Sequence, residues 1–330
     1  VQSAGVAIDD TNFPDANFCS FVASSFDEDN DNYLSDTEIN AAENINCADK
    51  GISDLTGISH FTALKTLNCY NNQLTSLDVS KNTALTDLYC DYNQLTSLDV
   101  SKNVALTKLR CWGNSLTKLD VSKNTALTYL DCDYNQLTSL DVSKNVALTY
   151  LDCRRNQLTA LDVSKNTALT KLNCYENQLT ALDVSKNTAL TYLNCRNNQL
   201  TSLDVSNTDM DDLDCRDNIY QIIVGNDRTF DLSTLPGNFD VAKTSDWSGG
   251  TVSGNTLTVD SDKDTVTYKY DCGKGKSETF TLKCVESADY ANVDAAIAKA
   301  NNLNKDDYKD FTAVEAAINA VVRGKNITEQ

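Results

Sequence analysis

The chain has 330 residues, of which 41% are hydrophobic and 23% are charged, a balance typical of a folded protein rather than a disordered one. Its formal net charge of −19 argues against binding of nucleic acid or of an anionic membrane surface, because both need a basic footprint. A single histidine, His60, argues against Ser-His-Asp and Cys-His catalysis, and no apolar run reaches the ~18 residues of a membrane-spanning segment.

The N-terminal region is strongly acidic and holds a regularly spaced set of oxygen-bearing residues. Residues 1–50 contain eleven acidic residues and one lysine. In DEDNDNYLSDTE, residues 27–38, carboxylates stand at the first, third, fifth and twelfth places, and Leu34 takes the apolar eighth. This spacing resembles the loop of an EF-hand, which implies that carboxylates, one backbone carbonyl and one hydroxyl surround a Ca2+ ion. The implied ligands are Asp27, Asp29, Asp31, Tyr33, Ser35 and Glu38.

The segments beside this loop are interpreted as short helices. Pro14 stands at a helix-start position, and Ser35 is placed to cap the second helix. Asn32 takes the sixth place, where Gly is usual, and asparagine tolerates the left-handed conformation better than most residues. We expect residues 1–44 to form an EF-hand-like helical cap on the first coil of the next region, with Ca2+ in a structural role. The alternative is an acidic surface turn that binds nothing.

A repeat of 21 residues governs the next part of the chain. Cysteines from Cys69 to Cys195 stand 21 residues apart, and Cys47 and Cys215 extend the series with spacings of 22 and 20. The shared pattern LxxLxCxxNxLxxLDVSxNxA resembles the leucine-rich repeat family, with Cys in place of a third Leu. A unit this short cannot bury its own apolar face, so the copies must stack. The sequence therefore predicts a β-rich solenoid of eight to nine coils over residues 45–218, with short parallel strands and little helix.

Each repeat also predicts what its coil buries. The L-x-C segment is expected to be a parallel strand, and LDVS a second short strand or an extended turn. Asn93 and Asn103 belong to two expected asparagine ladders that satisfy backbone groups at the turns. The side chains expected to point inward are Leu85, Leu88, Cys90, Leu95, Leu98 and Val100.

The twelve cysteines have two interpretations. Many cysteines in a secreted protein usually indicate disulfides. The regular spacing instead favours a ladder of reduced thiols that pack as small hydrophobes. A hairpin that turns at Lys274 and Gly275 would place Cys272 and Cys284 about 20 Å apart, too far for a bridge. A bridge between Cys19 and the first cysteine of the ladder stays open. Many free thiols in an extracellular protein indicate an anaerobic source.

The repeats differ from one another mainly at four positions: three before, one before, one after and two after each Cys. In a leucine-rich repeat these positions project onto the open face of the strands. Eight of the fourteen tyrosines and one of the two tryptophans fall there, a composition typical of binding hot spots. The plainer alternative is that exposed strand positions simply favour aromatics. The candidate binding residues are Tyr89, Tyr92, Arg110, Trp112, Tyr129, Asp131, Asp133, Tyr134, Tyr150, Asp152, Arg154, Arg155, Tyr175 and Tyr192.

A catalytic interpretation of this face is weaker. Asp131 and Asp152 occupy one column of adjacent coils, about 5 Å apart, which is the separation of a retaining glycosidase pair. However, Arg110, Arg154 and Arg155 beside them should lower their pKa values, and an open sheet lacks a closed pocket. We expect no enzymatic activity. The opposite flank repeats Asp, Ser, Lys and Asn, and is interpreted as a solvated, self-neutralising surface without function.

After residue 218 the repeat gives way to a different pattern. TFDLSTL, GTVSGNTLTVD, DTVTYKYDC and SETFTLKC alternate with turn residues. They predict a small antiparallel β region over residues 219–287 that caps the last coil, with an immunoglobulin-like arrangement as one option.

Residues 288–330 change to a helical period. The stretch from ADYANVDAAIAKANNL to FTAVEAAINAVVRG resembles the FIVAR modules of bacterial cell-surface proteins, which implies a partial helical module of that kind.

Together these features indicate a secreted or surface-attached recognition module of an anaerobic bacterium. The leading hypothesis is a monomeric adhesin-type module that binds an unknown protein partner through the open face. The alternatives are a carbohydrate-binding module that targets a larger surface enzyme to a polysaccharide, and a structural spacer. Ca2+ is the one expected cofactor, and neither nucleic acid nor a membrane is an expected partner.

Overall fold

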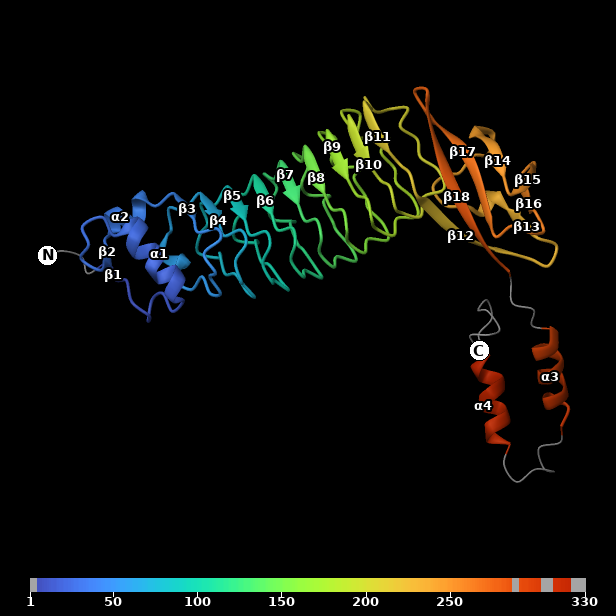
Figure 1. Ribbon diagram of the computed structural model, residues 1–330, viewed down its shortest axis with the longest axis horizontal. Helices are drawn as coiled ribbons and strands as arrows, with labels where there is room; N and C mark the ends of the chain where they lie inside the picture. The colour runs from blue at the N-terminus through green and yellow to red at the C-terminus, as the bar shows by residue number, and fades with distance from the viewer. Residues whose placement is uncertain (1–4, 287–290, 304–310, 322–330) are drawn as a thin grey trace.

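The centre of the molecule is a nine-stranded parallel sheet whose strands follow one another in chain order (Figure 1). The computed structural model describes residues 5–286, 291–303 and 311–321. Each strand has three residues and begins three positions before the cysteine of its repeat, so the predicted parallel strands are confirmed. The strands are β3 (Asn44–Asn46), β4 (Thr66–Asn68), β5 (Asp87–Tyr89), β6 (Lys108–Arg110), β7 (Tyr129–Asp131), β8 (Tyr150–Asp152), β9 (Lys171–Asn173), β10 (Tyr192–Asn194) and β11 (Asp212–Asp214).

The register of the sheet follows the repeat. Leu88 of β5 pairs with Leu67 of β4 on one side and with Leu109 of β6 on the other. Equivalent leucines therefore stack along the solenoid and form a continuous core. All six side chains predicted to point inward are buried, with Leu98 the least so. The LDVS segments form no strand, so of the two predicted options the extended turn is correct.

Two buried asparagine ladders hold the turns of the coils, as predicted. In the first, the Asn135 amide donates to the carbonyl oxygens of Cys111, Cys132 and Asp133 at 3.0–3.1 Å, and its Oδ1 accepts from the backbone N–H of Leu116 at 3.0 Å. In the second, the Asn145 amide donates to Val121 and Asn124 carbonyl oxygens at 3.0 and 2.9 Å, while its Oδ1 has no partner. Each ladder side chain thus links neighbouring coils.

Two short helices cover the first coil. They are α1 (Ala16–Phe26) and α2 (Asp36–Ala41), and a small antiparallel pair, β1 (Val6–Ala7) with β2 (Tyr33–Leu34), lies beside them. Helix α1 begins later than Pro14 because Asp15 is its N-cap and accepts from Phe18 N–H at 2.9 Å. The second carboxylate oxygen of Asp15 accepts from Ser53 N–H at 2.7 Å, which ties the cap to the solenoid. The helices and the solenoid share one hydrophobic core.

The β region after the solenoid is mixed rather than antiparallel, so that prediction is wrong in part. Strand β12 runs parallel to β18, because it leaves the last coil directly: Asn218 is both its first residue and the last member of an asparagine ladder. One sheet has the order β12-β18-β17-β14 and the other β13-β16-β15. The strands are β12 (Asn218–Val224), β13 (Thr229–Asp231), β14 (Thr244–Ser248), β15 (Gly250–Ser253), β16 (Thr256–Val259), β17 (Thr265–Gly273) and β18 (Lys276–Glu286).

The C-terminal helices are α3 (Ala291–Asn301) and α4 (Thr312–Ala320), as the helical period predicts. Their apolar side chains, among them Val293, Ile297, Val314 and Ile318, line one cleft between them. Residues 287–290, 304–310 and 322–330 of the FIVAR-like segment lie outside the described residues. Within the described ranges, no helix is both long and apolar enough to cross a membrane.

All twelve cysteines are free, as the regular spacing predicts, and Cys19 is not bonded to Cys47. The ladder from Cys47 to Cys215 is fully buried. Burial is the largest cause that raises the pKa of the thiols from Cys47 to Cys174. Buried, protonated thiols are inert toward oxidation. Their persistence therefore needs no anoxic habitat, and the inference of an anaerobic source loses its basis.

Candidate binding face and calcium loop

The open face is the side of strands β4–β11 that points away from the core. Its side chains fall into three groups along the solenoid. The aromatic group is Tyr70, Tyr92 and Trp112, the central group surrounds Asp131 and Asp152, and the arginine group surrounds Tyr175. Tyr89 lies on β5 with Arg110 over its ring, and Tyr192 lies on β10.

The aromatic group is a row of rings packed edge to face. The Tyr70 and Tyr92 ring centroids are 6.0 Å apart with an interplanar angle of 75°, and those of Tyr92 and Trp112 are 4.5 Å apart at 83°. Such geometry is the favoured one for aromatic pairs and fixes each ring in place. Tyr92 nevertheless keeps half of its surface exposed. The row therefore offers a partner a pre-ordered apolar surface.

The central group is a buried polar network beneath two stacked tyrosines. Tyr129 and Tyr150 lie parallel, with centroids 4.3 Å apart and an interplanar angle of 2°. Asp131, Asp133 and Asp152 are 8%, 1% and 1% exposed, so these three predicted contact residues are buried in the unbound chain. Neighbouring side chains cover them. Arg154 lies across two of them, with its Nε 2.8 Å from Asp133 and 3.4 Å from Asp152.

A further buried carboxylate, Asp91, was not among the predicted site residues. It is 3.0 Å from Arg110 Nη2, one coil away. The sequence does carry a signal for these pairs. Asp133 and Arg154 each follow the cysteine of their repeat, 21 residues apart, whereas Asp91 follows its cysteine and Arg110 precedes the next one. These aspartates pair with arginines and are themselves shielded from solvent.

Burial dominates the ionisation of this network. It raises the pKa of Asp91 to about 7, that of Asp131 to about 6 and that of Asp152 to about 7, against the opposing effect of the arginines. The arginines do act to lower the pKa values of Asp131 and Asp152, as predicted, but the predicted net fall is wrong because it neglected desolvation. The pKa argument against a general acid fails with it. The unenclosed geometry of an open sheet remains the argument against catalysis.

The position two after each cysteine has a left-handed backbone in the coils from β4 to β11. Its φ is +50° at Tyr92, +51° at Tyr134 and +49° at Arg155, and +66° at Gly113. Glycine and asparagine adopt this conformation readily, whereas bulky residues do so at a cost. Large side chains at these places are thus unfavourable for the backbone. Gly113, Asn71 and Asn197 in the same column were the sequence signal for this strain.

The acidic loop between α1 and α2 brings three of its six predicted ligands together. Asp27, Asp29 and Glu38 each offer an oxygen within 4.8 Å of the others. Asp31 is outside this group and accepts from Tyr33 N–H at 2.8 Å, while the Ser35 hydroxyl donates to Glu38 at 2.8 Å. The Ser35 hydroxyl is therefore engaged by Glu38 in this conformation.

The backbone and charges of this loop fit a cation. Asn32 has a φ of +66°, the left-handed conformation expected at its place. Ser35 caps α2 in a reciprocal capping box with Glu38, as predicted for Ser35. Burial acts to raise the pKa of Glu38, but hydrogen bonds from Ser35 and from nearby backbone amides outweigh it and lower that pKa. Partial desolvation and then the charge of Asp31 raise the pKa of Asp29. A bound cation would relieve this crowding of carboxylates.

The flank opposite the open face is a solvated surface, as predicted, but it is not neutralised by ion pairs. Asp99 accepts from Ser101 N–H, and Asp120 from Ser122 N–H, both at 2.9 Å, and the same turn recurs in the other coils. Hydrogen bonds from these serines lower the pKa of both carboxyls. In the described residues no lysine of this flank pairs with them.

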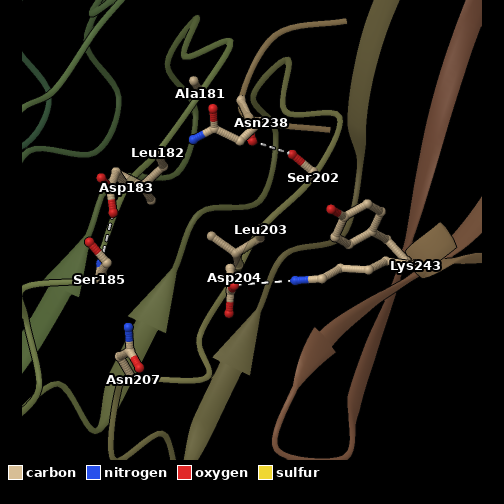
Figure 2. Close-up of a pocket in the computed structure, with 12 residues that line it drawn as sticks. Ala181, Leu182, Asp183, Ser185, Ser202, Leu203, Asp204, Asn207, Asn238 and Lys243 are labelled. Carbon is tan, nitrogen blue, oxygen red and sulfur yellow. Dashed lines mark hydrogen bonds and ion pairs between the residues drawn. The ribbon is translucent and has the colours of Figure 1, made fainter. Parts of the chain in front are cut away.

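A hollow of about 250 Å3 lies where this flank meets the β region (Figure 2). The Ser202 hydroxyl donates to the Gly237 carbonyl at 2.7 Å, and Lys243 Nζ lies 3.3 Å from Asp204. Beneath them the Tyr268 hydroxyl donates to the Thr201 carbonyl at 2.6 Å. These bonds attach the β region to the last coils, so the solenoid and its cap form one continuous core.

This architecture is a leucine-rich repeat solenoid. The family profile "Leucine Rich repeats (2 copies)" matches residues 62–103. Internalin J of Listeria monocytogenes serotype 4b (strain F2365) is 47% identical over 70 residues, which are 21% of this chain and 8% of that protein. The structure of internalin C2 from Listeria monocytogenes aligns with a TM-score of 0.59 at 19% identity, covering 64% of this chain and 98% of that one. A leucine-rich repeat protein from Leptospira interrogans aligns with a TM-score of 0.51 at 25% identity, covering 56% of this chain and 52% of that one.

The family profile covers part of the repeats and none of the flanking segments. The family profile lies within the solenoid, so the EF-hand and FIVAR resemblances stay predictions. Because the match spans 8% of internalin J, the properties of that whole protein are not transferred to this chain. What the comparisons establish is the fold and an internalin-like set of repeats.

Proposed function

We propose that this chain is a recognition module of a secreted or surface-attached bacterial protein, and that it binds a protein partner through the open face. The observation that carries the proposal is the exposure of Tyr92 and Tyr134, at 50% and 61%, on left-handed backbone. Rigid, partly exposed aromatic side chains next to arginines are characteristic of protein-binding hot spots. The location is supported by the internalin-like repeats, since internalins are secreted or surface-attached bacterial proteins.

The open face is pre-ordered for such binding. The stacked Tyr129 and Tyr150 and the buried ion pairs of Arg154 fix the central group before any partner arrives. Pre-ordering reduces the entropy lost on association. A monomeric module with a rigid face is therefore the simplest form of this proposal, and adhesion is the role it would serve on a cell surface.

The first test replaces Tyr92 and Tyr134 with glycine. We expect binding to fall by about tenfold or more, because two exposed aromatic contacts are lost. The free energy of unfolding should stay within about 1 kcal/mol of the parent, since glycine relieves the left-handed strain at both sites. Ligands are first selected with the parent protein from a peptide-display library and a glycan array. The affinity of the parent and of the glycine variant for each selected ligand is then measured, and urea denaturation gives the free energy of unfolding of both proteins.

The matched control is Lys102→Ala with Lys144→Ala, which removes two exposed side chains from the flank. Peptide hits that the control keeps and the glycine variant loses support a protein partner. Glycan hits with the same dependence favour the carbohydrate-binding alternative instead. A folded protein that selects neither class is a spacer.

A second proposal concerns the acidic loop, residues 27–38, which we infer binds one Ca2+ as a structural ion. The convergence of Asp27, Asp29 and Glu38 and the left-handed Asn32 support it. Carboxylate oxygens in a flexible loop are the ligands that Ca2+ prefers. Asp31 and Ser35 would have to turn toward the ion, and the Tyr33 backbone carbonyl would complete the predicted set. Because the loop sits between α1 and α2, the ion would stabilise the cap of the solenoid.

Calcium is expected to raise the melting temperature relative to chelator, and Glu38→Gln to abolish that difference. Saturating ligand at about 100 times its Kd stabilises a folded state by about 2.7 kcal/mol. Glutamine suits the variant because it preserves a capping box. Asp36→Asn removes one charge from the same helix turn and should leave the calcium effect intact. Equal melting of the parent with calcium and with chelator would exclude the site.

A further inference from the structure

The arginine group of the open face gathers positive charge in an otherwise acidic protein. The guanidinium carbons of Arg154, Arg155 and Arg196 lie 5.6, 5.5 and 5.4 Å from the centroid of the Tyr175 ring. The arginines and Tyr175 together come from three successive coils, in a chain whose net charge is −19. Contact with the ring face holds each guanidinium in place.

The three arginines differ in how well the chain itself neutralises them. Arg154 is paired at close range with two buried aspartates. Arg155 is 3.7 Å from both Asp133 and Glu176, too far for a good hydrogen bond. Within the described residues, Arg196 has no carboxylate at ion-pair distance, and its Nε is shielded from solvent with no acceptor. A buried donor without a partner is unfavourable, and an anion supplied from outside would satisfy it.

A comparison between neighbouring coils explains why Arg196 is unpaired. Arg216 stands in the same column one coil later, and Asp214, two residues before it, binds it with two contacts of 2.9 Å. The residue two before Arg196 is Asn194 instead. Its Oδ1 accepts from Arg196 N–H at 3.3 Å, as Asp214 does for Arg216, but its amide cannot neutralise the guanidinium. One Asp-to-Asn difference therefore leaves the arginine of this coil without an ion pair in the described residues, with Asp214 of the next coil, already paired with Arg216, as a more distant charge.

We propose that Arg196, with Arg155 beside the same ring, is a carboxylate-binding site that receives an acidic segment of the protein partner. This inference rests on the proposed function and specifies the chemistry of the partner. A guanidinium binds a carboxylate through two parallel hydrogen bonds. Next to the Tyr175 ring and partly shielded from water, that pair is stronger than an exposed one. The aromatic group would contact a separate, apolar part of the same partner.

The experiment measures the affinity of a short blocked glutamate peptide by fluorescence anisotropy at low ionic strength. The glutamine version of the peptide and polygalacturonate serve as further probes. We expect the glutamate peptide to bind better than the glutamine peptide, and added salt to weaken it. Arg196→Gln should reduce its affinity about tenfold, whereas Arg216→Gln, whose arginine is already paired, should reduce it by less than about twofold.

The most specific variant is Asn194→Asp, which recreates the internal pair of the next coil. It deletes no packing, and we expect it to remove glutamate-peptide binding as fully as Arg196→Gln does. Asn197→Asp adds the same charge one position after Arg196 and controls for general repulsion. Equal loss in both aspartate variants, or equal affinity for the glutamate and glutamine peptides, would overturn the proposal. Binding of polygalacturonate alone would overturn the peptide assignment in favour of an acidic polysaccharide.

The outcome is separable from that of the proposed function. A display-selected peptide that still depends on Tyr92 and Tyr134, while the glutamate peptide fails to bind, refutes only the carboxylate site. If the glutamate peptide fails to bind and no display-selected peptide depends on Tyr92 and Tyr134, the protein-binding function is refuted as well.

Discussion

Asn135→Ala is expected to lower the free energy of unfolding by about 4 kcal/mol, a large part of the stability of an ordinary domain. The side chain makes four hydrogen bonds to backbone groups of two coils. Alanine removes all four bonds, each worth about 1 kcal/mol net, and leaves the Leu116 N–H without its partner. The Cys111, Cys132 and Asp133 carbonyls keep second donors in Asn114, Asn156 and Gly113. The Cys132 N–H bond to the next coil is untouched, so the strand itself should persist.

Asn145→Ala is the matched control because Asn145 belongs to the other ladder. It is also buried, but it makes only two hydrogen bonds and its Oδ1 has no partner. Its replacement should therefore cost about half as much. Urea denaturation of the parent and both variants, compared at equal m-values, measures the difference. If Asn145→Ala proved as destabilising as Asn135→Ala, the hydrogen-bond count would not be the determinant, and the loss of buried volume common to both would be.

The sequence was sufficient for everything that the 21-residue period controls. A fixed period forces equivalent side chains into register, so the inward position of Leu88, the thiol ladder and both asparagine ladders followed from spacing alone. The EF-hand-like spacing likewise placed Asp27, Asp29 and Glu38 together. These features depend on local repetition or on short loops, where sequence distance and spatial distance agree.

What could not be predicted depends on neighbours across coils or on long-range pairing. Asp131 and Asp152 were placed on the correct face, yet both are buried, and Asp152 contacts Arg154 and Tyr150 of its own coil and Asn173 of the next. Periodicity gives the direction in which a side chain points, but not what covers it. The parallel pairing of β12 with β18 was missed for a related reason. The pattern of alternation is the same in parallel and antiparallel strands, and the direction of β12 is imposed by Asn218 in the ladder.

The network around Asp152 should make the protein less stable as the pH rises through the neutral range. Burial raises the pKa of Asp152 to about 7 and that of Asp131 to about 6, above the ordinary value of about 4. The folded state then binds more protons than the unfolded state between about pH 4 and pH 7. The stabilising contribution of this pair is therefore full below this window and is lost as the pH rises through the folded-state pKa, when both carboxyls become charged in a desolvated site.

Asp152→Asn is expected to remove much of this decline. The groups facing Asp152 are Arg154, the Tyr150 hydroxyl at 3.4 Å and the Asn173 amide at 3.3 Å, with Asp131 on the adjacent strand. Asparagine keeps the shape, and Arg154 retains its 2.8 Å contact with Asp133. The variant should gain about 2 kcal/mol at pH 8, less than the full shift implies because the paired aspartates share the penalty.

The measurement is the free energy of unfolding by urea at pH 5, 6, 7 and 8 for the parent and the variant. At pH 5 the two should differ little, because Asp152 is already protonated in the folded parent. Asp99→Asn on the flank is the control: hydrogen bonds from Ser101 lower its pKa, so its titration lies below this range and the slope should not change. A variant that is destabilised at pH 8, or that keeps the parent's slope, would show that Arg154 compensates the buried charge of Asp152 and that desolvation does not dominate this network.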